Sequence, residues 1–300
     1  MLNILQKKIK RTVVLFLVFV LLFTMIGFLA KAYKTKTLAK KEYGVFLSAD
    51  SSAMEQIKKY KTVVIDAQYF KKRDIESLHK NGTKVYTYLN IGSIEKFRKY
   101  YTTYKKLAIG KYEHWDEEQW VNVASPDWQK FMTKLARGLY KKGIDGFFID
   151  NCDVYYYAPR KSIFDGLTVI LKNIMTFGKK VIINGGDTYV MKYKEHYGTI
   201  NNIMTGINQE TVWSCIDFDK GTFSEQKKQE RDYFCKYLKA CKADGVEVYL
   251  LEYTTSRKLT RKIEKYCKKY GYYFYISDTL NWIRLGFSII RYYFCRKLFI

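Results

Sequence analysis

A regular alternation of short apolar segments with longer amphipathic segments, between residues 43 and 280, constrains the fold more than any other feature. The apolar segments are rich in β-branched and aromatic residues, which favour strands. We expect strands at residues 43–49, 62–67, 84–92, 144–149, 179–186, 201–209, 246–254 and 272–277. Their near-continuous apolar character is typical of strands that are covered on both faces.

The segments between these strands have apolar residues at helical spacing. We expect helices at residues 52–60, 73–82, 125–143, 164–178, 187–197, 224–245 and 256–271, and a long loop with local helix at residues 93–124. Eight strands that alternate with helices over this length predict an α/β protein with a (β/α)8 TIM barrel. The alternative is a doubly wound open sheet, which would be expected to carry a glycine-rich phosphate loop. Gly185-Gly186 is too short for that loop.

The N-terminus predicts a membrane anchor. Residues 12–30 contain no charged side chain, and a helix of this length reaches about 28 Å, close to the thickness of a bilayer core. Four basic residues precede the segment, namely Lys7, Lys8, Lys10 and Arg11. The excess of positive charge predicts that this end stays in the cytoplasm and that everything after the segment lies outside the membrane.

A cleaved signal peptide is the competing interpretation, because Ala30-Lys31-Ala32 has the small-x-small pattern of a cleavage site. The apolar stretch is longer than the usual apolar region of such a peptide, which favours an uncleaved anchor. Both interpretations place the rest of the chain in the extracytoplasmic space. We therefore divide the chain into an anchor with its basic stub at residues 1–32, a linker at 33–42, the barrel at 43–280 and an apolar, basic tail at 281–300.

The chain is strongly basic, with 53 Lys and Arg against 29 Asp and Glu and a formal net charge of +24. Most lysines occupy the polar positions of the predicted helices, as expected of a solvated surface. Attraction to an anionic partner is the alternative. The sequence has no zinc-finger spacing, no aromatic RNA-binding signature and no basic recognition helix, so we expect no nucleic-acid partner.

The six cysteines, at positions 152, 215, 235, 241, 267 and 295, match no metal-binding spacing. An exported chain can form disulfides, but their connectivity cannot be read from the sequence. None of the three histidines has a spacing that suggests a dyad with Cys152. We interpret Cys152 as a packing residue at a strand end, and we expect no cofactor.

Acids and amides follow the predicted strands at their C-terminal ends. They are Asp66, Asn90, Asp150, Asn151, Asp153, Asn184, Asn208, Glu210 and Glu252, with Glu95 and Arg98 just beyond the third strand. A TIM barrel gathers these ends on one face, which hosts the active site. In a chain with this much lysine, acids at most of the strand ends predict a site and not merely a solvated rim.

This pattern suits the hydrolysis of glycosidic bonds, which needs two carboxyl groups on either side of one bond. One carboxylate stays ionised, and the other has a raised pKa and protonates the leaving oxygen. Crowded carboxylates raise one another's pKa values, which helps the second role. Asp and Asn side chains also bond sugar hydroxyls, and aromatic residues near the strand ends, such as Tyr155, can stack on sugar rings. A cation site formed by Asp66, Asp150 and Asp153 is the alternative.

Four segments resemble the barrel domain of glycoside hydrolase family 114, the endo-α-1,4-polygalactosaminidases and their relatives. In order along the chain they are YLNIGSIEKFRKY, VNVASPDWQKF, GIDGFFIDNCDVY and INGG. The resemblance covers roughly residues 43–280, and its most specific part is the segment that contains Asp150, Asn151 and Asp153.

The resemblance implies catalytic roles for an Asp at the end of strand four and a Glu at the end of strand six. These match Asp150 as nucleophile or base and Glu210, in GINQET, as acid/base. It also implies that Asp66, Glu95, Arg98, Asp153 and Asn184 line the substrate groove. The net charge of +24 opposes long-range attraction of a cationic galactosamine polymer. A neutral or acetylated glycan and an anionic wall polymer therefore stay open as substrates.

We therefore expect a membrane-anchored, extracytoplasmic barrel that cleaves a polysaccharide with paired Asp and Glu carboxylates. The residues expected to bind the substrate are Asp66, Asn90, Glu95, Arg98, Asn151, Asp153, Tyr155, Asn184, Asn208 and Glu252, and we expect no metal site. A barrel that binds carbohydrate without cleaving it, and a metal-dependent polysaccharide hydrolase or deacetylase, are the alternatives.

Overall fold

The computed structural model describes residues 18–27, 40–112, 115–218 and 220–279. The chain divides into two compact units, residues 1–41 and residues 42–300. In the first unit, residues 18–27 are helical. Within the described ranges, no helix has the length and apolar character needed to cross a membrane. Residues 12–17 and 28–30 of the predicted anchor, and the whole C-terminal tail, lie outside the described residues.

The second unit is built around one eight-stranded sheet. Its strands are β1 (Lys41–Phe46), β2 (Tyr60–Ile65), β3 (Lys84–Asn90), β7 (Gly146–Asp150), β8 (Lys180–Asn184), β9 (Gly206–Glu210), β12 (Glu247–Tyr253) and β13 (Tyr273–Ser277). They lie side by side in chain order, and the ladders from β2 to β13 are parallel. Parallel strands in chain order, each separated from the next by helices, give the (β/α)8 arrangement.

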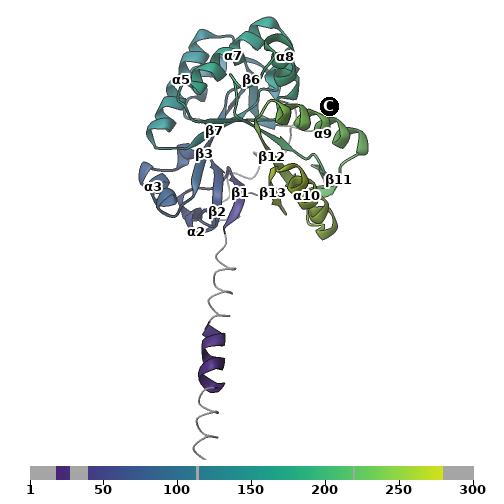
Figure 1. Cartoon of the computed structure of the whole chain (residues 1–300). Helices are drawn as coiled ribbons and strands as arrows, with labels where there is room; N and C mark the ends of the chain where they lie inside the picture. Colours follow the sequence, from purple (N-terminus) through teal and green to yellow (C-terminus); the bar gives the residue numbers. More distant parts are fainter. Residues whose placement is uncertain (1–17, 28–39, 113–114, 219, 280–300) are drawn as a thin grey trace, which may run out of the picture. The chain divides into compact units, whose positions relative to one another are not determined.

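Aromatic contacts bring the two edge strands of the sheet together. The ring of Phe46 on β1 lies 5.8 Å from the ring of Tyr275 on β13, and Tyr43 on β1 lies 4.9 Å from Tyr249 on β12. The sheet therefore curls into a nearly closed barrel, and Figure 1 shows its strands in the centre with the helices around them. This arrangement confirms the predicted TIM barrel and excludes the alternative fold, a doubly wound open sheet.

The main outer helices are α3 (Lys72–Lys80), α5 (Pro126–Lys141), α7 (Lys161–Met175), α8 (Asp187–Tyr197), α9 (Lys228–Ala243) and α10 (Arg257–Tyr270). Each of them has buried apolar residues. On α5, for example, Trp128 and Met132 are fully buried, and the indole of Trp128 donates to the carbonyl oxygen of Ile91 at 2.8 Å. This bond ties α5 to the loop that follows β3, next to the strand ends.

Two groups of strands lie outside the barrel sheet, and the sequence analysis missed both. The expected loop at residues 93–124 contains a three-stranded antiparallel sheet of β4 (Ser93–Glu95), β6 (Trp115–Val121) and β5 (Ala108–Tyr112), in the order β4-β6-β5. The start of the expected helix at 224–245 instead belongs to the hairpin of β10 (Ser214–Asp217) and β11 (Thr222–Glu225). Local hydrophobic periodicity is weak in short polar strands like these, which pair only with one another.

The remaining elements are short turns of helix. They are η1 (Ser51–Ala53), α2 (Met54–Ile57), η2 (Ala67–Tyr69), α4 (Tyr101–Tyr104), η3 (Lys105–Leu107) and α6 (Val154–Tyr157). The expected helix at residues 52–60 is thus two short turns, and its cap is Asp50, whose side chain accepts from the backbone of Ser52. No disulfide joins the five cysteines that the structure describes. Cys152 is fully buried, which fits the packing role expected of it.

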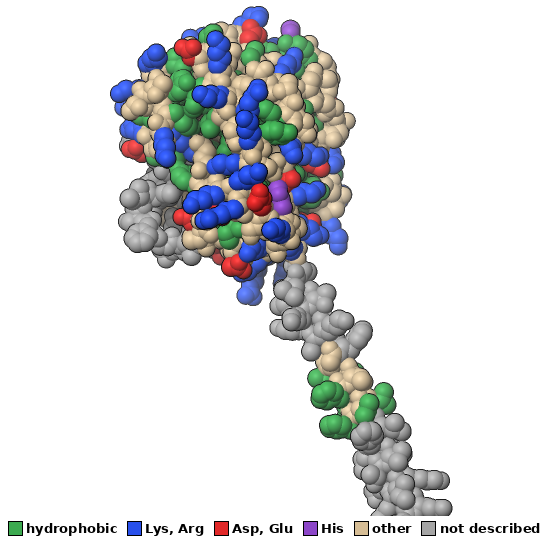
Figure 2. Space-filling model, turned by 90° about the vertical axis from the view of Figure 1, so that its left-hand side faces the viewer, with side chains coloured by type: hydrophobic (Ala, Val, Ile, Leu, Met, Phe, Trp, Pro, Cys, Tyr) green, Lys and Arg blue, Asp and Glu red, His purple; other side chains and the backbone are tan. Residues whose placement is uncertain are grey.

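Positive and negative side chains are distributed differently in the second unit. Figure 2 shows Lys and Arg side chains spread over the side of the barrel that lies at the left of Figure 1. By contrast, six acids are at most 7% exposed, namely Asp66, Glu95, Glu118, Asp150, Glu210 and Glu252. All of them lie at or near the C-terminal ends of barrel strands or on the inserted sheet β4-β6-β5, so this buried negative charge belongs to one face of the barrel.

Candidate active site

Two buried carboxylates and one amide form the centre of the strand-end face. Asp150, Asn184 and Glu210 are the last residues of three neighbouring strands, β7, β8 and β9. Nδ2 of Asn184 donates to Oδ1 of Asp150 at 2.9 Å and to Oε1 of Glu210 at 2.9 Å. Because both oxygens bond the same nitrogen, they are separated by no more than twice that distance. The parallel register of the sheet therefore brings together two carboxyl groups that are 60 positions apart in the chain.

The amide of Asn184 is itself held in one orientation. Its Oδ1 accepts from Nδ2 of Asn208 at 2.7 Å, and Oδ1 of Asn208 accepts from the hydroxyl of Tyr43 at 3.4 Å. With its oxygen occupied in this way, Asn184 must direct its NH2 group toward the two carboxylates. Asn184 and Asn208, both expected at the site, are thus the residues that fix the spacing of the pair.

The outer oxygen of each carboxylate bonds a buried tyrosine. Tyr88 donates its hydroxyl to Oδ2 of Asp150 at 3.1 Å, and Tyr253 donates to Oε2 of Glu210 at 2.8 Å. Burial, followed by the charges of Asp150 and Glu95, raises the pKa of Tyr88 well above its ordinary value. The hydroxyl of Tyr88 therefore keeps its proton at neutral pH and can act as a hydrogen-bond donor.

The backbone turns sharply after each carboxylate. The two residues other than glycine that have positive φ in the described structure are Asn151, at 66°, and Thr211, at 50°. One directly follows Asp150 and the other directly follows Glu210. Such a conformation is unfavourable, above all for the β-branched Thr211, and it persists only where the surrounding structure holds it. Strain of this kind concentrates at functional sites.

A buried ion-pair cluster lies beside Asp150. Nη1 of Arg98 contacts Oδ2 of Asp66 at 2.6 Å, and its Nε contacts Oε2 of Glu95 at 2.8 Å. Burial opposes the charge of Arg98, but the two carboxylates outweigh it and raise the pKa of the guanidinium. The hydroxyl of Tyr88, which bonds Asp150, also lies 3.3 Å from Oε1 of Glu95. Tyr88 therefore links this cluster to Asp150. Two acids, Asp66 and Glu95, therefore share the one cation of Arg98.

The inserted sheet contributes an acid that the sequence analysis missed. Glu118 on β6 is 7% exposed, and its Oε1 accepts from Nδ2 of Asn90 at 3.0 Å and from Nδ2 of Asn151 at 2.8 Å. Asn90 and Asn151 were expected to bind substrate, but their amide groups point to Glu118 and Ser93. The segment WDEEQWV has four polar residues in a row and no alternation of apolar and polar residues, so hydrophobic periodicity gave no signal for Glu118.

Three of the expected site residues occupy other places. Oε2 of Glu252, a fully buried side chain, accepts from the backbone N–H of Ser214 at 2.9 Å and from its hydroxyl at 2.6 Å. Burial raises the pKa of Glu252 to about 7. Asp153 accepts from the N–H of Gly186 at 3.1 Å, and the ring of Tyr155 packs against Phe164. Glu252 thus anchors the start of β10. The bond of Asp153 joins the turn after β7 to the turn after β8, and the contact of Tyr155 joins α6 to α7.

The acids do not gather into the cation site considered above. Asp66 pairs with Arg98, Asp150 bonds Asn184 and Tyr88, and Asp153 bonds Gly186. Among the described residues, no group of three or more His, Cys, Asp or Glu side chains has the arrangement of a metal site.

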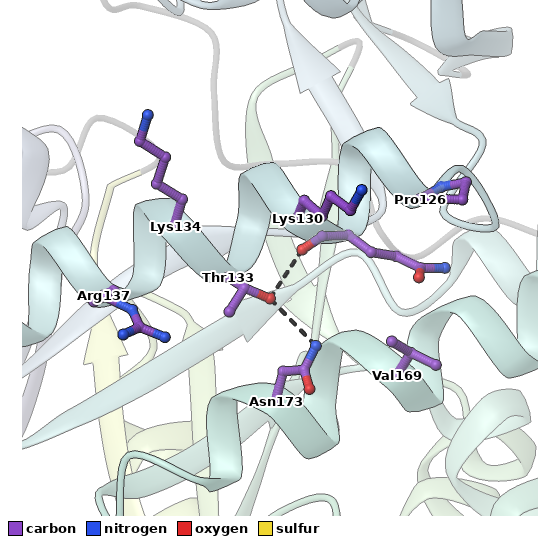
Figure 3. A pocket seen from close by; sticks show the side chains of 8 residues that line it. Pro126, Lys130, Thr133, Lys134, Arg137, Val169 and Asn173 are labelled. Carbon is purple, nitrogen blue, oxygen red and sulfur yellow. Dashed lines mark hydrogen bonds between the residues drawn. The ribbon is translucent and has the colours of Figure 1, made fainter.

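A hollow of about 360 Å³ lies on the outside of the barrel, between α5 and α7. Figure 3 shows its lining, in which Thr133 of α5 accepts a hydrogen bond from Asn173 of α7. Its charged lining residues are Lys130, Lys134 and Arg137, and none of the strand-end residues takes part. This hollow is therefore separate from the carboxylate pair.

The family model of glycoside hydrolase family GH114 matches residues 29–286 of the chain. This chain belongs to family GH114. As a member of that family it is a glycosidase with a barrel fold, and its substrate is a glycan.

Solved structures show the same fold at low identity. The glycoside hydrolase domain of PelA from Pseudomonas aeruginosa has a TM-score of 0.68 and 19% identity, and the match covers 82% of this chain and 98% of that chain. Aspergillus fumigatus Ega3, in complex with galactosamine, has a TM-score of 0.62 and 15% identity over 80% of this chain and 92% of that one. An uncharacterized protein of Methanocaldococcus jannaschii, MJ1477, is 22% identical over 72% of this chain and 69% of its own length.

Proposed function

We propose that this GH114 chain is a retaining, endo-acting glycoside hydrolase with Asp150 as nucleophile and Glu210 as acid/base. The observation that carries the proposal is the shared amide of Asn184, which lies 2.9 Å from an oxygen of each carboxylate. Carboxyl groups about 5–5.5 Å apart are typical of retaining enzymes, whereas inverting enzymes separate them by about 6.5–9.5 Å. The two carboxylate oxygens that bond Asn184 can be separated by no more than twice 2.9 Å, and this limit favours the retaining geometry.

The reaction then has two steps. An oxygen of Asp150 attacks the anomeric carbon while Glu210 gives its proton to the leaving glycosidic oxygen, so that one sugar chain departs and the other stays bound to Asp150 as an ester. Water enters next, Glu210 takes one of its protons, and the hydroxide attacks the anomeric carbon and releases Asp150. Both groups return to their starting protonation states, and the product keeps the configuration of the substrate.

The neighbours of the pair favour these roles. Tyr88 and the amide of Asn184 both donate to Asp150, and these bonds hold its carboxyl group in one orientation for attack. The hydrogen bonds from Tyr253 and Asn184 hold the carboxyl group of Glu210 in place, and this side chain is 6% exposed on a face that carries other buried acids. Asn184 touches both groups, so it keeps the distance between them constant as the proton and the sugar move.

The substrate class that fits this face is an amino-sugar polymer with free amines. Asp66, Glu95, Asp150 and Glu210 are buried at or just beyond the strand ends, and the buried cation among the described residues of this face is Arg98. An excess of buried carboxyl groups favours a cationic sugar over an acidic one. The galactosamine bound to Ega3 is a sugar of this kind.

The experiment replaces Asp150 with Asn and measures oligosaccharide release from partly de-N-acetylated galactosamine polymer by mass spectrometry. We expect Asp150→Asn to lower turnover at least about 1,000-fold, because the amide cannot form the ester intermediate. The matched control is Asp165→Asn on α7, where the carboxylate pairs with Lys161 on the surface, and this variant should cleave normally.

Two results would count against the proposal. Full turnover by Asp150→Asn would exclude Asp150 as the nucleophile. A first product of inverted configuration, detected by NMR, would exclude the retaining mechanism. If the wild-type chain binds the polymer but releases no product from a broad panel of glycans, a non-catalytic carbohydrate-binding barrel becomes the better description.

We also propose that the barrel works outside the cytoplasm, held by the apolar segment at residues 12–30. The support is the basic flank before this uncharged segment. Fractionation of cells that express the full chain, followed by protease treatment from outside, tests this location. Recovery of the chain in the soluble cytoplasmic fraction would contradict it.

A further inference from the structure

Glu118 is buried at the edge of the active-site face without contacting either member of the carboxylate pair in its described hydrogen bonds. It lies on β6 of the inserted sheet, directly opposite Glu95 of β4 in the antiparallel register. Two charged carboxylates in such a cross-strand pair repel each other. Arg98 neutralises Glu95, whereas Glu118 bonds only neutral donors in the described structure, namely Ser93, Asn90 and Asn151.

These four side chains form a closed network. The NH2 group of Asn90 donates to Oγ of Ser93 at 2.6 Å and to Oε1 of Glu118 at 3.0 Å. The NH2 group of Asn151 does the same, at 2.6 Å and 2.8 Å. A short hydrogen bond joins Ser93 to Glu118. Each amide therefore bridges the same two oxygens, and the loss of one oxygen leaves both amides with an unpaired hydrogen.

The network acts on the residue that follows the proposed nucleophile. Asn151 has a φ of 66°, and its carbonyl oxygen packs so closely on Gly92 that a Cβ at position 92 would lie 1.7 Å from it. The carbonyl of Asp150 accepts from the N–H of Ile91 at 3.1 Å. The loop after β3 and the turn after β7 are thus held against each other by the backbone on one side and by the Glu118 network on the other.

We propose that Glu118 is a positioning residue for the GH114 reaction, which holds the side chain of Asn151 and thereby fixes the turn that orients Asp150. This inference rests on the proposed nucleophile. It adds a role for the inserted sheet, because β6 supplies the oxygen that bridges Asn90 of β3 and Asn151 of the β7 turn.

The surroundings keep Glu118 from adding a negative charge at this place. The titratable groups that face it are Glu95 on β4, Asp150 on β7, Tyr88 on β3 and Tyr112 on β5, and no described ion pair reaches it. Burial, followed by the charge of Glu95, raises the pKa of Glu118 to about 8. At neutral pH the carboxyl group is therefore mostly protonated and bonds Ser93 and the two amides without repelling Asp150.

The test measures kcat and KM of full-length variants on the polymer that the wild-type chain cleaves. Glu118→Ala should lower kcat about 10- to 100-fold with KM changed less than twofold, because the nucleophile is displaced while the groove stays in place. Glu118→Gln should recover most of the turnover, since an amide replaces a neutral carboxyl group in shape and polarity. The matched control is Glu117→Ala, whose exposed carboxylate pairs with Lys96, and it should behave as wild type.

A double-mutant cycle separates positioning from general support of the fold. Asn151→Gly removes the side-chain link but accepts the positive φ. If Glu118 acts through Asn151, adding Glu118→Ala to Asn151→Gly should lower kcat by less than about threefold, far less than it does alone. Thermal unfolding of each variant shows which of them fold.

Additive losses in the cycle, or a change in KM without a change in kcat, would overturn the proposal, as would wild-type turnover of a folded Glu118→Ala. These outcomes are independent of the main assignment. If the wild-type chain cleaves and Asp150→Asn does not, the proposed function stands whether or not Glu118 positions the nucleophile.

Discussion

At the scale of single residues, the active-site face places similar acids in different surroundings. Asp150 accepts a tyrosine hydroxyl and an amide, Glu95 bonds Arg98, and Glu118 bonds neutral donors opposite Glu95. Partners that favour the charged form stabilise a carboxylate, whereas burial beside like charge favours the protonated form. The face therefore combines Asp150, the proposed nucleophile, with Glu118, a buried carboxyl group that is mostly protonated at neutral pH.

This difference predicts a pH effect on stability. The pKa of Glu118 is about 8 in the folded protein, above its ordinary value of 4.5. The folded state thus holds a proton that the unfolded state loses, so the contribution of Glu118 to stability is fully present below about pH 4.5 and is lost as the pH rises through about 8. Relative to wild type, Glu118→Gln should gain more than about 1 kcal/mol of unfolding free energy between pH 5 and pH 9.

Urea unfolding of the wild type and of Glu118→Gln, at several pH values across this range, measures the effect. Glu117→Gln serves as the control, and its stability should follow that of the wild type at every pH. Parallel curves for wild type and Glu118→Gln would show that Glu118 is already ionised in the folded protein at neutral pH.

At the scale of elements, the inserted sheet and the barrel approach each other at Gly92, where the space is too small for any side chain. The turn between β3 and β4 passes Asn151 at Gly92, and the sheet β4-β6-β5 then carries Ser93, Glu95 and Glu118 to the strand ends. The inserted sheet therefore contributes side chains to the strand-end face of the barrel. It supplies three polar side chains that bond neighbours of Asp150, namely Tyr88 and Asn151.

The contact at Gly92 gives the prediction at this scale. Gly92→Ala should destabilise the protein by about 1–3 kcal/mol, because a Cβ overlaps the carbonyl oxygen of Asn151. It should also lower kcat about 100-fold as the turn after Asp150 shifts. Thermal unfolding and polymer cleavage measure the two effects.

The matched control is Gly138→Ala on α5, where a Cβ meets nothing within 4 Å. Because alanine is the better helix former, this substitution should stabilise the protein by about 0.5–1 kcal/mol and leave cleavage intact. Equal effects of the two substitutions would mean that the turn at Gly92 can move without disturbing the site.

At the scale of the whole molecule, charge is divided between the surface and the site. The chain has a net charge of +24, Lys and Arg side chains cover the face shown in Figure 2, and the acids near the strand ends are buried. Surface charges act on a distant polymer through solvent, where salt screens them within about 10 Å at 0.1 M. Buried acids act at short range, where screening is weak.

A cationic polymer should therefore meet repulsion at a distance and attraction in the groove. We expect its KM to fall several-fold as NaCl rises from about 10 to about 150 mM, since salt removes the long-range repulsion first. A short neutral oligosaccharide should show no such change. Steady-state kinetics with both substrates measure the difference, and a KM for the cationic polymer that rises with salt would point to attraction by the whole surface.

The sequence by itself determined the barrel and the strand ends. The alternation of strands and helices fixed the order of the sheet, and Asp150, Asn184, Asn208 and Glu210 were identified at the ends of strands that prove to be neighbours. These features are local or periodic, so they can be read from one stretch of chain at a time. Element boundaries differed by a few residues, and the strands outside the barrel sheet, β4, β5, β6, β10 and β11, were missed.

Only the tertiary structure decided which polar groups serve the carboxylate pair and which bond one another. Glu252 and Asp153 follow strands as Asp150 does, yet the first anchors β10 and the second holds Gly186. Glu118 lies on the inserted sheet and not at the end of a barrel strand, yet its side chain accepts a hydrogen bond from Asn151. The direction of a buried side chain depends on donors and acceptors far away in the chain, and those partners are assembled only when the barrel closes and the inserted sheet packs on it.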